Sequence, residues 1–292
     1  MNQLGPILRN DTRPLADVRV AALATAVPRY RFGQDEAMER VRRVVPGFAH
    51  MTGIFANSGI ERRYSSVPLE WYDTQRGWRE SNAVYVENAL ELLQQAAGKA
   101  LADAALTPHD IDAIVLVSST GLAVPSLDAL LSNRMDFSPN VERTPIFGLG
   151  CAGGTAGLAR ASQIARARPG ANVLLLVVEL GGLNVHYDPE SAAMFVATAL
   201  FGDGAAAVIL NALTAVEDSA GALLRVGPSG EHLWRESQSI MGWEIMDDGW
   251  AVVLSGALPQ FVEQRLRAAA LDFLARNGLT PADLAGYVMH PG

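Results

Sequence analysis

The sequence contains a single cysteine, Cys151, among its 292 residues. One cysteine excludes an intrachain disulfide and a cysteine-rich metal site. Basic residues are outnumbered, with 23 Lys and Arg against 31 Asp and Glu, for a net charge of −8. A chain of this charge without a basic run is a poor binder of nucleic-acid phosphates, so we expect no nucleic-acid partner. The five histidines show no metal-ligand spacing, so we expect no metal.

Long apolar runs are also absent. The longest stretches, such as residues 173–178, fall well short of the roughly 18 residues that a membrane span needs. Residues 1–13 carry three charged side chains in place of the apolar core of a signal peptide. We therefore expect a soluble, cytoplasmic protein without a membrane span. Apolar residues make up 49% of the chain, enough for the packed core of about two domains.

Helices and strands alternate in the sequence pattern. Residues 18–23, 113–117, 173–178 and 205–210 are near-continuous Val, Ile, Leu and Ala, which predicts strands covered on both faces. Residues 81–105 have helical periodicity. Residues 153–167 also have a helical pattern but consist largely of Ala and Gly, which is typical of a tightly packed central helix. The alternation predicts an α/β layered architecture.

An internal repeat indicates duplication. Residues 106–111 (LTPHDI) resemble residues 279–284 (LTPADL), offset by 280 − 107 = 173 positions. Each copy follows a helical pattern (81–105 and 258–277) and precedes a predicted strand (113–117 and 286–289). In each, Thr is expected to cap a turn, with Pro at its first helical position and Asp supporting the exposed amides. The sequence predicts halves over residues 1–212 and 213–292, the second incomplete.

Cys151 lies in a glycine-rich segment, residues 144–154, that predicts a short strand, a tight turn and the start of a helix. Unpaired amides and the helix dipole at such a position favour the thiolate. Glycines let backbone donors converge on an oxyanion. These features favour a nucleophile, although most lone cysteines are small buried hydrophobic residues.

The same segment also satisfies a dinucleotide-binding pattern. Gly148, Gly150 and Gly153 follow a predicted strand and open a helix, and Glu179 ends the next strand, where it is placed to hold a ribose. Against this hypothesis, a nucleotide-binding unit usually opens its domain, and the bulky thiol stands where a pyrophosphate must approach. A dinucleotide-binding oxidoreductase remains the distant alternative.

Two further segments stand at predicted strand ends. His290 ends the predicted strand 286–289, and strand ends are where open α/β sheets place their sites. By the repeat, a Cys from one half and a His from the other meet near a pseudo-two-fold axis. Residues 200–205 (LFGDGA) predict a tight turn in which Asp203 bonds its own backbone.

These motifs together resemble one family. Residues 148–154 (GLGCAGG), 200–206 (LFGDGAA) and 290–292 (HPG), with 59–64 and 118–126, are similar in order and spacing to the type III polyketide synthases. These are the chalcone-synthase-like members of the thiolase superfamily. The resemblance implies a duplicated thiolase-like α/β fold of layered helices and mixed sheets, and a homodimer.

The resemblance also implies roles for individual residues. Cys151 is the acyl-carrying nucleophile, His290 stabilises its thiolate and polarises a thioester carbonyl, and Phe201 gates the cavity. Val124 reaches across the dimer toward the partner's cavity, and Arg62 or Arg63 contacts the coenzyme A phosphates. The remaining cavity positions are Ser119, Thr120, Gly181, Trp243 and Val252.

The implied reaction uses acyl-coenzyme A and malonyl-coenzyme A as substrates and needs no cofactor. Val252 stands where plant members carry a second gating Phe, and Gly181 stands where they carry a pocket Thr. Both changes are expected to enlarge the cavity. With residues 241–249, which resemble the bacterial alkylpyrone and alkylresorcinol synthases, they predict a long-chain fatty acyl starter and an alkylpyrone or alkylresorcinol product.

Two alternatives stay open. A ketoacyl synthase III-like condensing enzyme also uses a Cys at a helix start, although the Phe201 and His290 motifs fit it less well. The family's active-site Asn lies beyond the His-Pro-Gly motif, in a stretch that this sequence does not contain. The chain is therefore expected to be truncated, and a catalytically silent fragment is the second alternative.

Overall fold

The computed structural model describes residues 16–44, 46–74, 76–184, 191–212, 224–247 and 249–290. Its centre is a mixed six-stranded sheet in the order β5-β4-β6-β7-β1-β8. β4 runs parallel to β5 and β6, whereas β6, β7, β1 and β8 are antiparallel neighbours. The strands are β1 (Val18–Ala26), β4 (Ala113–Val117), β5 (Glu142–Ile146), β6 (Asn172–Leu180), β7 (Asp203–Ala212) and β8 (Leu224–Val226).

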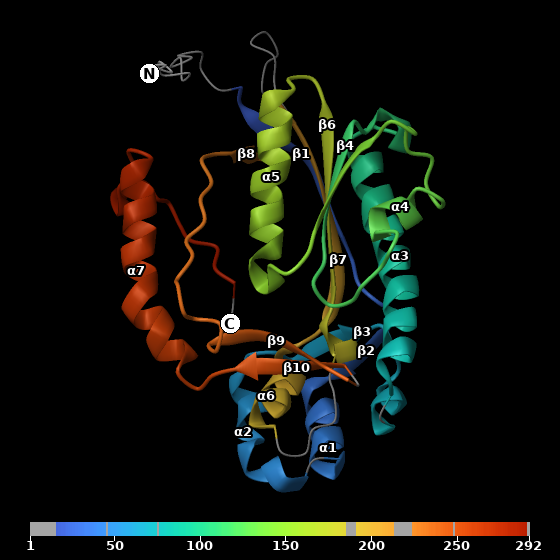
Figure 1. Cartoon of the computed structure of the whole chain (residues 1–292), viewed down its shortest axis with the longest axis vertical. Coiled ribbons are helices and arrows are strands. Elements are labelled where there is room, and N and C mark those ends of the chain that lie inside the picture. The colour runs from blue at the N-terminus through green and yellow to red at the C-terminus, as the bar shows by residue number, and fades with distance from the viewer. Residues whose placement is uncertain are drawn as a thin grey trace, which may run out of the picture.

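Helices cover both faces of this sheet, as the strand composition predicts. α3 (Trp78–Asp103) packs on one face and α5 (Gly153–Ala167) on the other (Figure 1). Along β4, Ile114 and Leu116 join the apolar cluster with α3, while Val115 and Val117 join the cluster with α5. Side chains alternate between the faces of a strand, so a continuous apolar run serves both helices.

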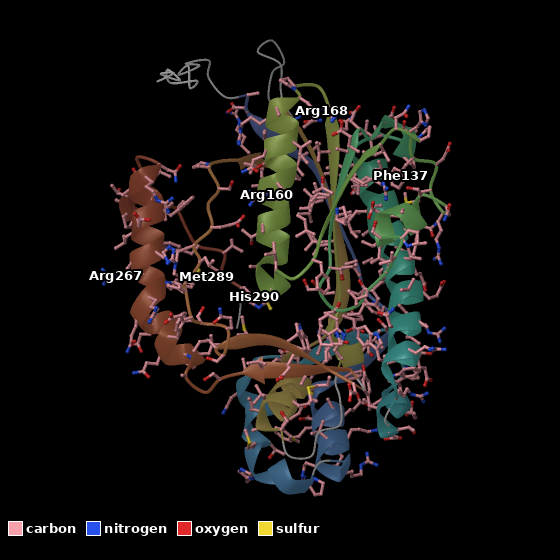
Figure 2. All side chains as sticks on the ribbon, in the orientation of Figure 1. Phe137, Arg160, Arg168, Arg267, Met289 and His290 are labelled. Carbon is pink, nitrogen blue, oxygen red and sulfur yellow. The ribbon has the colours of Figure 1, made fainter. Side chains whose placement is uncertain are left out.

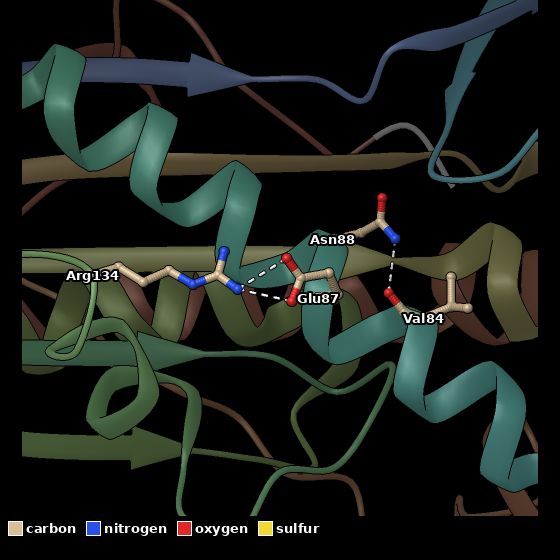
Figure 3. A network of polar contacts seen from close by, with 4 residues as sticks. All are labelled: Val84, Glu87, Asn88 and Arg134. Atoms are coloured by element: carbon tan, nitrogen blue, oxygen red, sulfur yellow. Dashed lines mark hydrogen bonds and ion pairs between the residues drawn. The ribbon is translucent and has the colours of Figure 1, made fainter.

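Polar contacts hold the outer sides of these helices. Arg160 of α5 donates to Glu231 at 2.7 Å, and Figure 2 labels it beside the helix. On the other side of the sheet, Arg134 follows α4 (Leu127–Leu131) and donates to both carboxylate oxygens of Glu87 in α3, at 3.0 and 2.8 Å (Figure 3). Both pairs are partly exposed and tie a connecting segment to a helix.

A smaller helical layer lies below the sheet in Figure 1. It contains α1 (Gln34–Val44), η1 (Pro46–Met51), α2 (Gly53–Asn57), η2 (Leu69–Asp73), α6 (Ala192–Leu200) and the hairpin of β2 (Tyr30–Gly33) and β3 (Arg62–Ser65). Its buried core brings together Ala37, Phe55, Phe195 and Ala199. The rings of Phe55 and Phe195 meet edge to face with centroids 5.7 Å apart.

The last part of the described chain forms an antiparallel hairpin, β9 (Met241–Met246) and β10 (Gly249–Leu254), followed by α7 (Leu258–Arg276) and η6 (Pro281–Asp283). The repeated capping motif has the same geometry in both copies. Thr107 bonds Asp110 at 2.8 Å through its amide and 2.6 Å through its hydroxyl, before η3 (Pro108–Asp110). Thr280 bonds Asp283 at 2.7 Å through each group. The predicted local chemistry of the repeat is therefore confirmed.

One expectation about the second half needs correction. The predicted strand at 286–289 does not form, and these residues are exposed and without regular structure. Its counterpart β4 has a partner strand on each side, whereas no described strand pairs with 286–289. β8, which follows the predicted boundary at residues 212 and 213, pairs with β1 in the central sheet.

Candidate active site

Cys151 lies between β5 and α5. Residues 147–149 form a turn, the 3-10 turn η4 (Gly150–Ala152) contains the cysteine, and α5 begins at Gly153. Gly148 and Gly150 have φ of +85° and +50°, a backbone region that side chains with a Cβ rarely adopt. The predicted strand, glycine turn and helix start are confirmed, and they leave Cys151 as a free, exposed thiol.

Ser119 holds this turn in place through hydrogen bonds. Its hydroxyl oxygen accepts hydrogen bonds from the amides of Gly148 at 3.3 Å and Gly150 at 3.2 Å. Its own amide donates to Glu179 at 3.0 Å, and the Thr120 hydroxyl donates to the same carboxylate at 2.7 Å. Ser119 and Thr120 are both buried. The hydroxyls expected to line the cavity are therefore used within the fold, to fix the nucleophile turn.

The ionisation of Cys151 differs from the expectation that its helix-start position favours a thiolate. Partial burial of the thiol, together with the negative charge of Glu179, raises the pKa of Cys151 above its ordinary value. The structure positions the thiol without lowering its pKa. A positively charged group beside the thiol would oppose this shift.

Glu179 does not have the role that a dinucleotide site requires. It is largely buried at the end of β6, and its carboxylate accepts hydrogen bonds from Ser119 and Thr120. Burial raises the pKa of Glu179, and these hydrogen bonds partly oppose the effect. With its oxygens already bonded within the chain, the carboxylate is not presented to a ribose, and the dinucleotide alternative loses its acidic residue.

His290 lies in the segment after η6, and its side chain is exposed. It is not held at a strand end, because the strand expected at 286–289 does not form. A role for His290 at the thiol of Cys151 stays a prediction.

Phe201 follows α6 directly and packs between two elements. Its Cβ lies 3.3 Å from where a Cβ on Gly181 would lie, in η5 (Gly181–Asn184), and its ring centroid is 5.8 Å from that of Trp243 in β9. Trp243 is the cross-strand partner of Val252. The Phe201 ring therefore fills the space at Gly181, and Trp243 borders Val252. The expected enlargement of the cavity at these two positions is not supported by this packing.

Three aromatic residues join Phe201 and Trp243, and the sequence motifs did not single them out. Trp250, which is buried in β10, contacts Trp243 with ring centroids 6.0 Å apart. It also contacts Trp78 at 5.4 Å and Phe147 at 5.9 Å. Phe147 belongs to the turn that leads to the nucleophile. The cluster connects the β9–β10 hairpin to both the gate position and this turn, and spacing along the chain gave no signal of it.

Asp203 departs from the expected local turn. Instead of bonding its own backbone, this buried carboxylate accepts from the amide of Ser66 at 2.7 Å and of Gly182 at 2.8 Å. Burial raises the pKa of Asp203. The residue thus links the end of β3 and η5 to the start of β7, behind Phe201.

The two arginines proposed for the coenzyme A phosphates have different surroundings. Arg62 is exposed and pairs with Glu61 at 3.8 Å, so it remains a candidate. Arg63 is buried, with its guanidinium directed to the carbonyls of Thr198 and Phe201, and is not available to a phosphate in solution. Alternation along β3 turns neighbouring residues to opposite faces, which separates the two.

Val124 is 99% exposed. An apolar side chain so fully in water is compatible with a buried place in an assembly, as the resemblance implies. Among the described residues no group of three or more His, Cys, Asp or Glu is arranged to hold a metal ion. In the same part of the chain, no helix has the length and apolar character to cross a membrane.

Comparisons with known proteins agree with the geometry. The family "chalcone and stilbene synthases, N-terminal domain" matches residues 73–213. The chain is 38% identical, over 277 residues, to 1,3,6,8-tetrahydroxynaphthalene synthase of Streptomyces peucetius subsp. caesius, covering 94% of this chain and 73% of the relative. It is 27% identical to an alpha-pyrone synthesis polyketide synthase-like protein of Mycobacterium tuberculosis, covering 94% and 72%.

Comparison of the fold with solved structures finds the same kind of enzyme. The crystal structure of 1,3,6,8-tetrahydroxynaphthalene synthase from Streptomyces coelicolor superposes with a TM-score of 0.81 at 29% identity, covering 94% of this chain and 78% of that one. The chain thus spans about three quarters of the length of these relatives. The expected α/β fold with layered helices and mixed sheets is confirmed.

Proposed function

The chain belongs to the type III polyketide synthases, acyltransferases that perform decarboxylative condensation, and we propose that Cys151 is the residue that carries the acyl chain. The observation that supports this most directly is the exposed thiol on a glycine turn held by Ser119. A nucleophile must be exposed and fixed, and this turn provides both. The substrates of the proposed reaction are coenzyme A thioesters.

The proposed reaction has two steps. The thiolate of Cys151 attacks the starter thioester, so the acyl carbon gains a bond to Sγ, its bond to the coenzyme A sulfur breaks, and coenzyme A leaves as a thiolate that takes a proton from solvent. Malonyl-coenzyme A then loses carbon dioxide, and the electron pair of the broken bond forms an enolate. The enolate carbon attacks the acyl–Cys151 thioester, a carbon–carbon bond forms, and the thiolate is released.

His290 is the proposed cationic partner of Cys151. Because burial and the charge of Glu179 raise the pKa of Cys151, a protonated imidazole beside it would favour the thiolate. The same group would polarise the thioester carbonyl. His290 is exposed and lies outside regular structure.

For the starter, we propose a short acyl group whose polyketide closes to a fused aromatic ring, of the kind named for the tetrahydroxynaphthalene synthases. This is supported by the 38% identity to one such enzyme. It is also supported by the Phe201 ring that fills the space at Gly181, and by Trp243 beside Val252. Malonyl-derived units alone can supply such a ring skeleton.

A second candidate is the long-chain fatty acyl starter that the sequence predicts, with an alkylpyrone or alkylresorcinol product. It is favoured by the 27% identity to an alpha-pyrone synthesis polyketide synthase-like protein. For a long chain to enter, the Phe201–Trp243 contact must open. The two candidates therefore differ in whether this aromatic contact limits the cavity.

The test combines intact-protein mass spectrometry with product analysis. The chain is mixed with acyl-coenzyme A thioesters of several lengths, with Cys151→Ala as the control. We expect a mass increase of one acyl group, absent in the control. Products are then compared with malonyl-coenzyme A alone and with an added long-chain thioester. An adduct that persists in Cys151→Ala would exclude this cysteine as the nucleophile, and products formed only with the long-chain starter would favour the second candidate.

Two partner proposals accompany this function. Arg62, exposed on β3, is proposed to contact a coenzyme A phosphate, and Arg62→Ala is expected to raise the KM for the thioester without changing its maximal loading. Val124, on its exposed loop, is proposed to lie at the interface of a homodimer. The domain boundary at residue 212 remains an expectation from the sequence.

A further inference from the structure

The last carbonyls of α6 are bound by two side chains from distant parts of the sequence. Arg63 of β3 donates through Nη1 to the carbonyl of Phe201 at 3.0 Å and to that of Thr198, and through Nη2 to the side-chain oxygen of Gln34. Gln34, at the start of α1, donates to the carbonyl of Ala199 at 2.9 Å. A helix leaves its last carbonyls without intrahelical partners, and here the Arg63–Gln34 clamp binds them.

Arg63 is the charged member of the clamp. It is buried, and no carboxylate among the described residues forms an ion pair with it. Arg63 and Gln34 are both buried, and the described hydrogen-bond partners of the Arg63 guanidinium are neutral oxygens. Burial lowers the pKa of Arg63 to about 10, which leaves it charged at neutral pH. The C-terminal end of a helix carries partial negative charge, so α6 stabilises this cation. A buried charge is costly, which argues that the arrangement serves more than helix capping.

The clamp acts on the residue that borders the cavity in the proposed function. Phe201 is the first residue beyond α6, and Arg63 binds its carbonyl directly. On the other side, the Phe201 ring rests against Gly181 and Trp243. The backbone of Phe201 is thus held by Arg63, while its ring reaches the β9–β10 hairpin.

We propose that Arg63, supported by Gln34, is a positioning residue that sets the Phe201 ring against Trp243 and thereby determines how many condensations the cavity allows. The inference rests on the proposed function, in which Phe201 borders the acyl cavity. Arg63 touches no reacting atom and acts only through Phe201. A lysine carries a single nitrogen and cannot bind both the two carbonyls that Nη1 of Arg63 binds and the Gln34 oxygen that Nη2 binds, so the ring is expected to lose its fixed orientation.

The first experiment measures products. Arg63→Lys is compared with wild type and with Arg134→Lys, the same change in an arginine that bonds Glu87 of α3 (Figure 3). We expect Arg63→Lys to alter the ratio of products with different numbers of condensations by about tenfold or more, because a misplacement of about 1 Å at a site can cost up to about 10²-fold in rate. Loading of Cys151 is expected to persist, and Arg134→Lys is expected to match wild type.

A second variant tests the contribution of Gln34 separately from that of Arg63. Gln34→Glu keeps the oxygen that accepts from Arg63 but loses the amide that donates to Ala199. We expect its product ratio to stay closer to wild type than that of Arg63→Lys, because the bond to the Phe201 carbonyl remains. In a Phe201→Leu background, Arg63→Lys is expected to cause no additional shift.

The third measurement does not depend on activity. Hydrogen–deuterium exchange followed by mass spectrometry compares the peptides over α6 and over β9–β10 in wild type and Arg63→Lys. Faster exchange in both is expected if Arg63 sets the contact of Phe201 with Trp243. Faster exchange in α6 alone, or an unchanged product ratio in a variant that loads acyl groups, would reduce Arg63 to a helix cap and overturn the inference. If wild type forms no Cys151 adduct, the proposed function fails, whereas the exchange result still decides the positioning role.

Discussion

Gly157 lies on the face of α5 that packs against the central sheet. A Cβ at this position would lie 2.6 Å from Cγ2 of Val117 and 2.9 Å from Cδ1 of Leu175. Both neighbours are buried, so neither side chain can move away freely. Gly98, inside α3, offers a matched control, because it is exposed and a Cβ there would meet nothing within 4 Å.

The two substitutions to alanine share one contribution to the free energy of unfolding and differ in another. Each removes a flexible glycine from a helix, which stabilises the folded state by about 0.5–1 kcal/mol. Gly157→Ala also overpacks the core, at a cost of about 1–3 kcal/mol. We therefore expect Gly98→Ala to be more stable than wild type by about 0.5–1 kcal/mol, and Gly157→Ala to be less stable than Gly98→Ala by about 1–3 kcal/mol.

Urea unfolding followed by far-ultraviolet circular dichroism measures both differences. Val117→Ala in the Gly157→Ala background is expected to recover part of the loss specifically, because it removes the nearest clashing methyl group. Acyl loading of Cys151 is measured in parallel, since α5 begins two residues after the nucleophile. Equal stabilisation by Gly157→Ala and Gly98→Ala would refute the close approach of α5 to the sheet.

Two further predictions concern ionisation. Glu179→Gln removes the negative charge that raises the pKa of Cys151, so we expect that pKa to fall and iodoacetamide to alkylate the lone cysteine faster at neutral pH; an unchanged pH profile of the alkylation rate would contradict the assigned cause. Hydrogen bonds from Thr107 hold the pKa of Asp110 below its ordinary value, so its stabilising contribution is present at neutral pH and lost as pH falls through the folded-state pKa, below about 4. The difference in Tm between wild type and Asp110→Asn is therefore expected at pH 7 and should disappear in acid, and a difference independent of pH would argue against the capping carboxylate.

Local signals predicted the elements whose residues satisfy their own requirements. β4 and α5 have the predicted bounds, because a strand covered on both faces must be apolar throughout and a helix close to a sheet must be small. The capping motifs form in both copies because Thr, Pro and Asp meet within one turn. The glycine turn at Cys151 follows from the positive φ angles that only glycine adopts readily.

Features that depend on distant partners were predicted less well. The apolar segment 286–289 matches the strand pattern, but a strand also needs a neighbour, and no described strand pairs with it. The space left by Gly181 depends on Phe201, which lies 20 positions away along the chain. The burial of Arg63 depends on α6, which packs against β3 only in the folded chain. In each case the sequence showed the type of residue but not the residues that surround it in the folded chain.

The reactivity of the Cys151 thiol also depends on residues that lie far from it in the sequence. The first half of the chain places Cys151 on a fixed turn, and the residues that hold this turn end in Glu179, a carboxylate. Partial burial of the thiol and this carboxylate both disfavour the thiolate, so the arrangement that holds the turn also contributes to the raised pKa of Cys151. A cation beside the thiol would oppose this shift. His290 is the residue that we propose for this role.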